Sequence, residues 1–202
     1  MTSINYQYNI ISSNCIGGWY YRLMGLPFQN PFIWDTMKLS DFIKLIKNFD
    51  DINFENIKTD ISNLNNVKNN CSHLILNDSI NVYFTHHNLG VNEGIRKLNS
   101  DIDVESKDIL KYIEDCWLRR YKRMKEAKSE PIFVYWDAQY LTDVPLNCLL
   151  DIKNQKIIII TENITSKINT KNTLWFKKST TDTKRLTNEL ISFFGKNKNL
   201  FM

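Results

Sequence analysis

A cysteine stands where the first predicted strand gives way to the first predicted helix. The apolar run Tyr8–Ser12 is typical of a β-strand, and the polar pair Ser13-Asn14 that follows it can cap a helix beginning at Cys15. Free N–H groups and the dipole at the start of a helix stabilise a thiolate, so this position predicts a lowered pKa for the Cys15 thiol. The same N–H groups can bind an oxyanion. The alternative is that Cys15 is a small apolar residue that packs the helix onto the sheet.

Two adjacent histidines provide a candidate base for that thiol. His86 and His87 follow the β-rich run 81–84 and precede Asn88. A histidine is the usual base for a cysteine nucleophile because its pKa lies close to neutral, and the sequence leaves open which of the two points inward. The alternative is polar turn material at a strand end. Adjacent side chains on an extended segment point apart and no third or fourth ligand is evident, so the sequence predicts no metal site.

Polar residues also follow the two most apolar runs of the chain. Asp137 comes directly after the run 131–136, and Glu162 and Asn163 follow the run 156–161. In open α/β sheets, ligands bind in the crevice outside the carboxyl ends of parallel strands. We therefore expect Asp137 to lie near a ligand, the alternative being a cap or turn residue.

A basic run on a predicted long helix is a candidate anion site. Arg119 and Arg123 are one turn apart on the same helix face, and two guanidinium groups at that spacing can hold a phosphate or a carboxylate. The alternative is a solvated helix face. Trp34 belongs to an aromatic loop with Phe28 and Phe32, which can line a sugar or acyl pocket or can pack onto the core.

Strands alternate with helices along the chain, which predicts an α/β fold: a three-layer α/β/α arrangement with a mixed, mostly parallel sheet. The continuous apolar runs 131–136 and 156–161 are typical of central strands that are buried on both faces. The other predicted strands are 8–12, 73–76, 81–86 and 173–176, of which the middle two form a β-hairpin or lie as two adjacent strands. The predicted helices are 15–24, 41–49 with Ser40 as its cap, 105–128 and 182–194.

The composition indicates one ordinary globular domain. The chain has 202 residues, of which 43% are hydrophobic and 24% charged, and no linker rich in Gly or Pro divides it, so residues 1–202 are predicted to form a single α/β domain. A net charge of +4 is smaller than the positive charge that is typical of a nucleic-acid-binding protein. The four cysteines lack C-x-x-C spacing, and neither a signal peptide nor a transmembrane segment is evident, so the sequence predicts a cytoplasmic protein. No motif indicates a cofactor.

Several short motifs occur in an informative order. They are Asn9–Gly18 (NIISSNCIGG), Gly25–Pro27, Asn30–Phe32, His86-His87 and Trp117–Arg123. Together they resemble an uncharacterised bacterial family labelled exopolysaccharide biosynthesis protein, and the resemblance covers about residues 8–163. The order of Ser-x-Asn-Cys, Pro31–Trp34 and a later histidine also resembles a second family, described as papain-like cysteine peptidases. That second resemblance implies Cys15 as nucleophile and one of the two histidines as base.

The first hypothesis is therefore a cysteine-dependent acyl-transfer or hydrolytic enzyme of bacterial surface-polysaccharide biosynthesis. In it Cys15 attacks a carbonyl group, His87 or His86 moves the proton, and Asn14 holds the oxyanion with the N–H groups of the first helix. The pathway is implied by the resemblance, and it makes a glycan or a sugar nucleotide the expected substrate.

The remaining candidate residues support this site. Asp137 or Asn88 orients the imidazole, Arg119 and Arg123 bind an anionic part of the substrate, and Trp34 lines the pocket. The second hypothesis is a non-catalytic protein of the same pathway that binds a sugar nucleotide or a partner enzyme in the same crevice. A glycosyl- or sugar-phosphate transferase is less favoured because the chain has no Gly-rich phosphate-binding loop.

Overall fold

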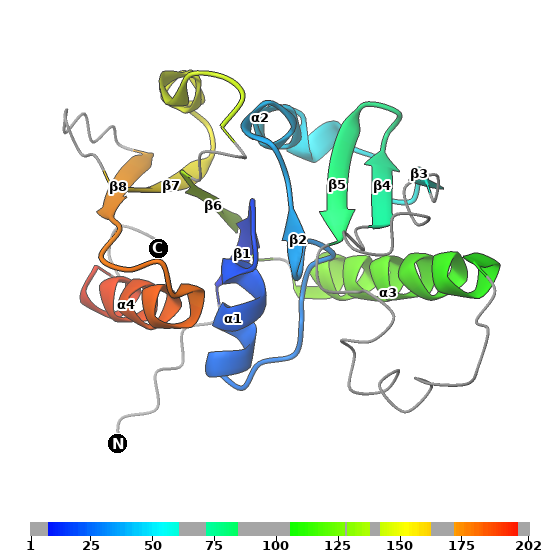
Figure 1. Ribbon diagram of the computed structural model, residues 1–202, viewed down its shortest axis with the longest axis horizontal. Coiled ribbons are helices and arrows are strands. Elements are labelled where there is room, and N and C mark those ends of the chain that lie inside the picture. Colours follow the sequence, from blue (N-terminus) through cyan, green and yellow to red (C-terminus); the bar gives the residue numbers. More distant parts are fainter. Residues whose placement is uncertain are drawn as a thin grey trace.

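The predicted α/β fold is confirmed by a computed structural model, which describes residues 8–60, 72–84, 106–127, 129–137, 142–162 and 172–197 (Figure 1). Four parallel strands form the first sheet in the order β1-β6-β7-β8. Their bounds are β1 Asn9–Ser12, β6 Pro131–Trp136, β7 Lys156–Thr161 and β8 Thr173–Lys177. All four strands run the same way, so their carboxyl ends meet at one edge of the sheet.

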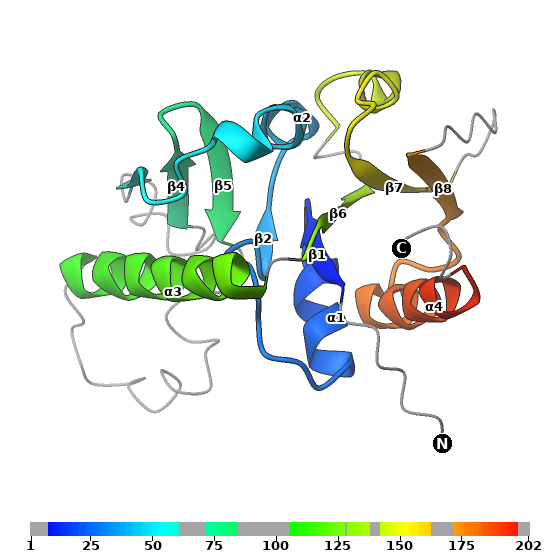
Figure 2. The same ribbon diagram turned by 180° about the vertical axis from the view of Figure 1, so that it is seen from behind.

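Helices cover both faces of this sheet because β6 and β7 are apolar on both sides (Figures 1 and 2). On one face, α1 (Ile16–Leu23) and α4 (Thr183–Lys196) pack side by side on a cluster that includes Ile10, Ile132, Val134, Ile158 and Ile160. On the other face, α2 (Leu39–Lys47) and the short 3₁₀ helix η3 (Leu146–Leu149) cover Ile11, Phe133, Tyr135, Ile157 and Ile159. The alternation of side chains along a strand separates the two clusters.

The antiparallel strands form a second sheet with the order β2-β5-β4-β3. Its strands are β2 Asp35–Thr36, β3 Ile57–Asp60, β4 Ser72–Leu76 and β5 Ile80–Phe84. The predicted hairpin is β4–β5, and the second sheet lies against α3 (Ser106–Ala127), with η1 (Phe49–Asp51) following α2. The expected mixed sheet is thus divided in two, with the Met37 N–H donating to the Ser13 carbonyl (3.0 Å) between them. Within the described ranges, no helix is both long and apolar enough to cross a membrane.

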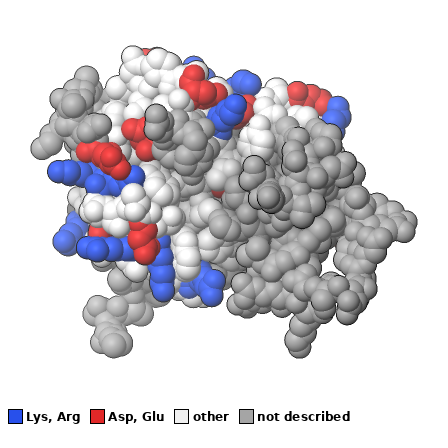
Figure 3. Space-filling view, in the orientation of Figure 1, with Lys and Arg blue, Asp and Glu red and all other residues white. Residues whose placement is uncertain are grey.

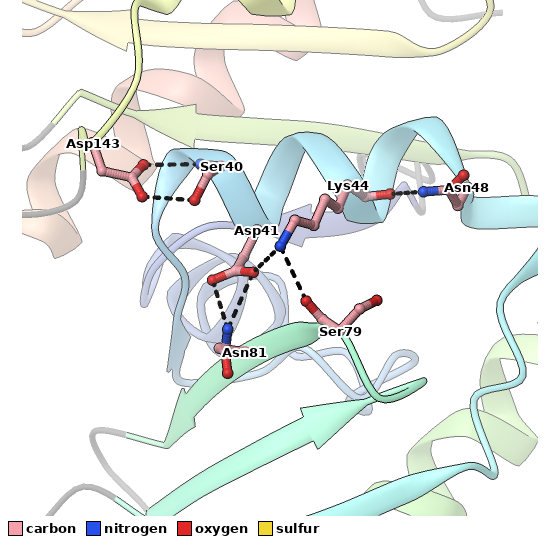
Figure 4. A network of polar contacts seen from close by, with 7 residues as sticks. All are labelled: Ser40, Asp41, Lys44, Asn48, Ser79, Asn81 and Asp143. Carbon is pink, nitrogen blue, oxygen red and sulfur yellow. Dashed lines mark hydrogen bonds and ion pairs between the residues drawn. The ribbon is translucent and has the colours of Figure 1, made fainter.

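The residue that caps the start of α2 is not the predicted Ser40. Ser40 lies inside the first turn, and the helix begins at Leu39 without a side-chain cap from its own N-cap residue, Lys38. Asp143 takes that role from a distant part of the chain. Its carboxylate accepts hydrogen bonds from the Ser40 N–H (3.0 Å) and the Ser40 hydroxyl (2.6 Å) (Figure 4). A carboxylate at this position also complements the helix dipole.

A second group of polar contacts joins α2 to the β4–β5 turn (Figure 4). Asp41 is almost fully buried and accepts two hydrogen bonds from the Asn81 amide, at 3.2 and 3.3 Å. Lys44 lies 3.3 Å from the same carboxylate and also donates to the Ser79 carbonyl at 3.2 Å. Because a buried carboxylate needs hydrogen-bond partners, the three contacts from these two donor groups, the Asn81 amide and the Lys44 ammonium, make its burial tolerable.

We expect Asp143→Ala to lower the free energy of unfolding by about 1 kcal/mol at neutral pH, the usual cost of losing a helix cap. Partial burial alone raises the pKa of the Asp143 carboxyl, but the hydrogen bonds from Ser40 outweigh it and hold that pKa below its ordinary 3.8. The stabilisation is therefore present above pH 3.8 and is lost as the pH falls through the lowered folded-state pKa. Urea unfolding of the unmodified protein and of Asp143→Ala at pH 7 and at pH 3 checks this prediction. A difference in free energy of unfolding between the two proteins that is the same at both pH values would contradict it.

Candidate functional site

The carboxyl ends of β1 and β6 bring two of the predicted site residues onto neighbouring strands. The Ser13 N–H donates to the Val134 carbonyl at 3.0 Å, and the Ser13 hydroxyl accepts from the Trp136 N–H at 3.3 Å. Cys15 therefore follows one strand and Asp137 follows its direct neighbour, at the same edge of the sheet. This is the edge at which ligands bind in parallel α/β sheets.

Cys15 occupies the N-cap position of α1. It is half-buried, forms no disulfide, and has helical backbone angles (φ −64°, ψ −2°). Two N–H groups of the first turn already have acceptors in the chain: that of Ile16 donates to Asn14 Oδ1 at 3.1 Å, and that of Gly17 donates to Ser12 Oγ at 2.8 Å. Those two groups are therefore satisfied before any ligand arrives.

Asn14 supplies a donor that these backbone groups do not. Its side chain is only 2% exposed, and its Nδ2 is buried without a hydrogen-bond partner, while its Oδ1 is fixed by the Ile16 N–H. Leaving a buried donor unsatisfied costs about 1–3 kcal/mol, so this amide is poised to gain from an acceptor oxygen. The residue directly precedes Cys15 in the chain.

Asp137 is held in place by two threonine hydroxyls. Thr142 donates to its Oδ1 at 3.0 Å and Thr161 donates to its Oδ2 at 2.8 Å. The Tyr135 hydroxyl hydrogen-bonds Thr142 at 2.8 Å, and the Asp137 N–H donates to the Ile160 carbonyl at 2.8 Å. The carboxylate is thus fixed across the ends of β6 and β7, and each oxygen still has a lone pair for another donor.

Trp34 lies against the first turn of α1. Its backbone is in the left-handed region (φ 65°), and its ring covers Gly18 so closely that a Cβ there would lie 2.4 Å from the indole. The indole is also edge-on to Trp19, with centroids 5.5 Å apart, and to Phe28, at 6.4 Å. The structure therefore brings Trp34 to within one helical turn of Cys15, where Gly18 makes room for it.

Asp35 is a buried acid near this edge that the sequence reasoning did not assign to the site. It is fully buried, and neither carboxylate oxygen has a hydrogen-bond partner. Burial raises its pKa well above the ordinary value, and the nearby Arg120 guanidinium only partly opposes this effect. The segment that follows it contacts the residue before Asn14, through Met37 and Ser13. In the sequence, Asp35 stands out because it is the only charged residue between Arg22 and Lys38.

A family described as a domain of unknown function, DUF1919, matches residues 2–163 of the chain. The chain belongs to the DUF1919 family. The matched region of this DUF1919 protein includes Asn14-Cys15, Trp34, Asp35 and Asp137, and it ends just after β7, so β8 and α4 lie beyond it. A search of curated proteins finds no match.

The predicted arginine pair of this DUF1919 protein contacts two different neighbours. Arg123 donates to the Phe28 carbonyl at 3.2 Å, whereas Arg119 donates to Cys116 Sγ at 3.3 Å. Arg120, between them, is buried, lies 5.3 Å from the centroid of the Phe28 ring and donates to the Ile33 carbonyl at 3.5 Å. Arg120 and Arg123 therefore both hold the aromatic loop, and the structure does not bring Arg119 and Arg123 onto a common partner.

Three predicted site residues lie outside the described residues. They are His86, His87 and Asn88, and their roles stay predictions. Asp101 and Asp103, two carboxylates spaced as Asp-x-Asp, lie outside the same ranges. In the part of the chain that is described, no three His, Cys, Asp or Glu side chains are grouped so that they could hold a metal ion.

Proposed function

We propose that this DUF1919 protein is a cysteine-dependent acyl-transfer or hydrolytic enzyme of bacterial surface-polysaccharide biosynthesis, with Cys15 as its nucleophile. The observation that carries the proposal is the Asn14 amide, a buried donor without an acceptor, directly before a half-buried thiol at the ligand-binding edge of a parallel sheet. A carbonyl oxygen that becomes negatively charged during attack is the acceptor this arrangement suits.

The reaction proceeds in two steps. Sγ of Cys15 attacks the carbonyl carbon while its proton passes to His86 or His87, and the carbonyl oxygen becomes an oxyanion that accepts from Asn14 Nδ2. The tetrahedral intermediate then collapses, the leaving group takes the proton from the imidazole, and a thioester remains on Cys15. Attack on that thioester by water gives hydrolysis, and attack by a sugar hydroxyl gives acyl transfer.

Asp137 is the proposed partner of the imidazole, with Asn88 as the alternative. Its two hydroxyl donors favour this role, because they hold the carboxylate in a fixed orientation on the strand next to Cys15. The pathway and the glycan or sugar-nucleotide substrate follow from the sequence resemblance, and the cytoplasmic location follows from the cysteine pattern of the sequence. All three remain part of the proposal.

The rate of iodoacetamide alkylation as a function of pH tests the nucleophile. We expect Cys15 to react selectively and with an apparent pKa well below that of Cys148, which is also half-buried and so serves as the matched internal control. Cys116, which is buried, should react slowest. Mass spectrometry of the alkylated peptides gives each rate separately.

A His86→Ala/His87→Ala variant completes the test. Removing the base should raise the apparent pKa of Cys15 towards that of Cys148. Equal reactivity of Cys15 and Cys148 in the unmodified chain would exclude the activated thiol and would favour the non-catalytic alternative, in which the same edge binds a sugar nucleotide or a partner enzyme.

A further inference from the structure

Two cations share a single indole ring on the exposed side of α1. The guanidinium carbon of Arg22 lies 5.5 Å from the centroid of the Trp19 ring, and Nζ of Lys184 lies 5.7 Å from the same centroid. Lys184 belongs to the first turn of α4, which packs beside α1 (Figure 1). The two positive charges are therefore no more than about 11 Å apart, close enough to contact one ligand.

These two cations are not neutralised by the acidic residues near them. Both Arg22 and Lys184 are exposed, and neither forms an ion pair with any of the described residues. Neighbouring cations do: Lys178 pairs with Glu162 at 2.6 Å, and Arg185 pairs with Glu189 at 3.6 Å. Figure 3 shows Lys and Arg side chains on the side of the molecule that α4 forms, with Asp and Glu side chains among them. Like charges that lack counter-ions create a positive potential that favours an anionic ligand.

The same helix face leads from these cations to the thiol. Cys15, Gly18, Trp19 and Arg22 are spaced i, i+3, i+4 and i+7, so they lie on one side of α1. At a rise of 1.5 Å per residue, Arg22 lies about 10 Å along the helix from Cys15. The ring of Trp34 covers Gly18 between them and meets Trp19 edge-on. An aromatic surface therefore connects the reactive end of the helix to its cationic end.

We propose that Trp19, Arg22 and Lys184 form a cation–indole face that binds an anionic group of the substrate, a phosphate or a sugar carboxylate. The inference rests on the proposed function of Cys15 and specifies its substrate: a molecule whose reacting carbonyl lies about 10 Å from a negative charge. Arg22 can hold two oxygens of such an anion with parallel N–H donors, Lys184 supplies a second charge, and the indole packs against the apolar side of a sugar ring or base.

Titration calorimetry with three probes tests this face. The probes are uridine diphosphate for the phosphate source, a glucuronate oligosaccharide for the carboxylate source, and neutral maltotriose as the uncharged reference. We expect saturable binding of one charged probe and none of maltotriose, and the probe that binds more tightly identifies the source of the anion. Saturable binding that weakens as salt is added is expected for such a contact.

The variant Arg22→Ala/Lys184→Ala should weaken that binding at least tenfold. The matched control is Lys177→Ala/Arg185→Ala, which removes two nearby exposed cations and so lowers the net charge equally. The control should change the affinity less than twofold. Equal losses in both double variants would show a general effect of charge, and unchanged binding in the first would show that the two cations only pack against Trp19. Either result would overturn the proposal.

The Cys15→Ala variant separates this inference from the proposed function. Binding of the charged probe should persist without the thiol, because the face does not include it. If alkylation shows an ordinary thiol while the probe still binds through Arg22 and Lys184, the enzyme proposal fails and the anion-binding face stands. If Cys15 is activated and neither charged probe binds, the cation–indole face fails and the enzyme proposal stands.

Discussion

Gly18→Ala is expected to destabilise the protein by about 2–3 kcal/mol, the cost of inserting a methyl group into a fully packed site. The new Cβ would lie 2.4–2.7 Å from three ring atoms of Trp34. That indole cannot retreat easily, because Trp19 and Phe28 meet it edge-on and its own backbone is in the left-handed region. Urea unfolding followed by circular dichroism measures the change.

Gly195→Ala is the matched control for that substitution. Gly195 also lies inside a helix, since α4 continues to Lys196 rather than ending at the glycine, but a Cβ there meets nothing within 4 Å. Alanine should therefore stabilise α4 by up to about 1 kcal/mol through helix propensity alone. Similar effects at the two positions would contradict the close packing of Trp34 on α1. A loss confined to Gly18 would link the packing of Trp34 to α1, the helix whose N-cap is Cys15.

Asp35→Asn is expected to make the protein more stable at neutral pH, although it changes a fully buried residue. Burial raises the pKa of the Asp35 carboxyl well above 3.8, so the folded chain keeps a proton that the unfolded chain releases. Between pH 3.8 and the raised folded-state pKa, stability therefore falls with rising pH by about 1.4 kcal/mol per pH unit from this group. The asparagine side chain does not titrate. In the variant, the contribution of residue 35 to the pH dependence of the free energy of unfolding should therefore disappear.

Urea unfolding of both proteins at intervals from about pH 4 to pH 8 measures that slope. The stability advantage of the Asp35→Asn variant should be small at the acidic end of this range and should grow as the pH rises. Asp41→Asn provides the opposite case, because Asp41 is also buried but accepts from Asn81 and Lys44, so that substitution should destabilise the protein. A parallel loss in both variants would show that Asp35 is charged and paired in the folded chain.

Local pattern was sufficient for the elements that carry the site. The runs 131–136 and 156–161 became β6 and β7 at those bounds, because short, continuous apolar segments rich in β-branched residues are typical of strands buried on both faces. The segment predicted as a helix over 105–128 became α3, Ser106–Ala127, because its apolar residues recur at helical spacing. Parallel pairing then followed from the alternation of strands and helices, and with it the meeting of the segments after β1 and β6 at one edge.

Short strands and caps were decided by distant partners. β2 has two residues and β3 lies in a polar stretch, so neither has a pattern of its own and each exists through its pairing with β5 or β4. Likewise Ser40 is a good cap residue by type, but Asp143, more than a hundred positions away in the chain, satisfies that helix start. Backbone groups at such sites take whichever partner the packing supplies.

The chemistry of individual side chains depended most on tertiary structure. The sequence determined the α/β class, the strands that place Cys15 and Asp137 at one edge, and the spacing of Arg119 and Arg123. Only the fold decided that the aromatic loop engages Arg120 and Arg123, that Asp35 is sealed from water, and that Lys184 meets Trp19 from another helix. Periodicity fixes the side of an element on which a residue lies, whereas burial and charge partners depend on the element packed opposite, which is distant in the sequence.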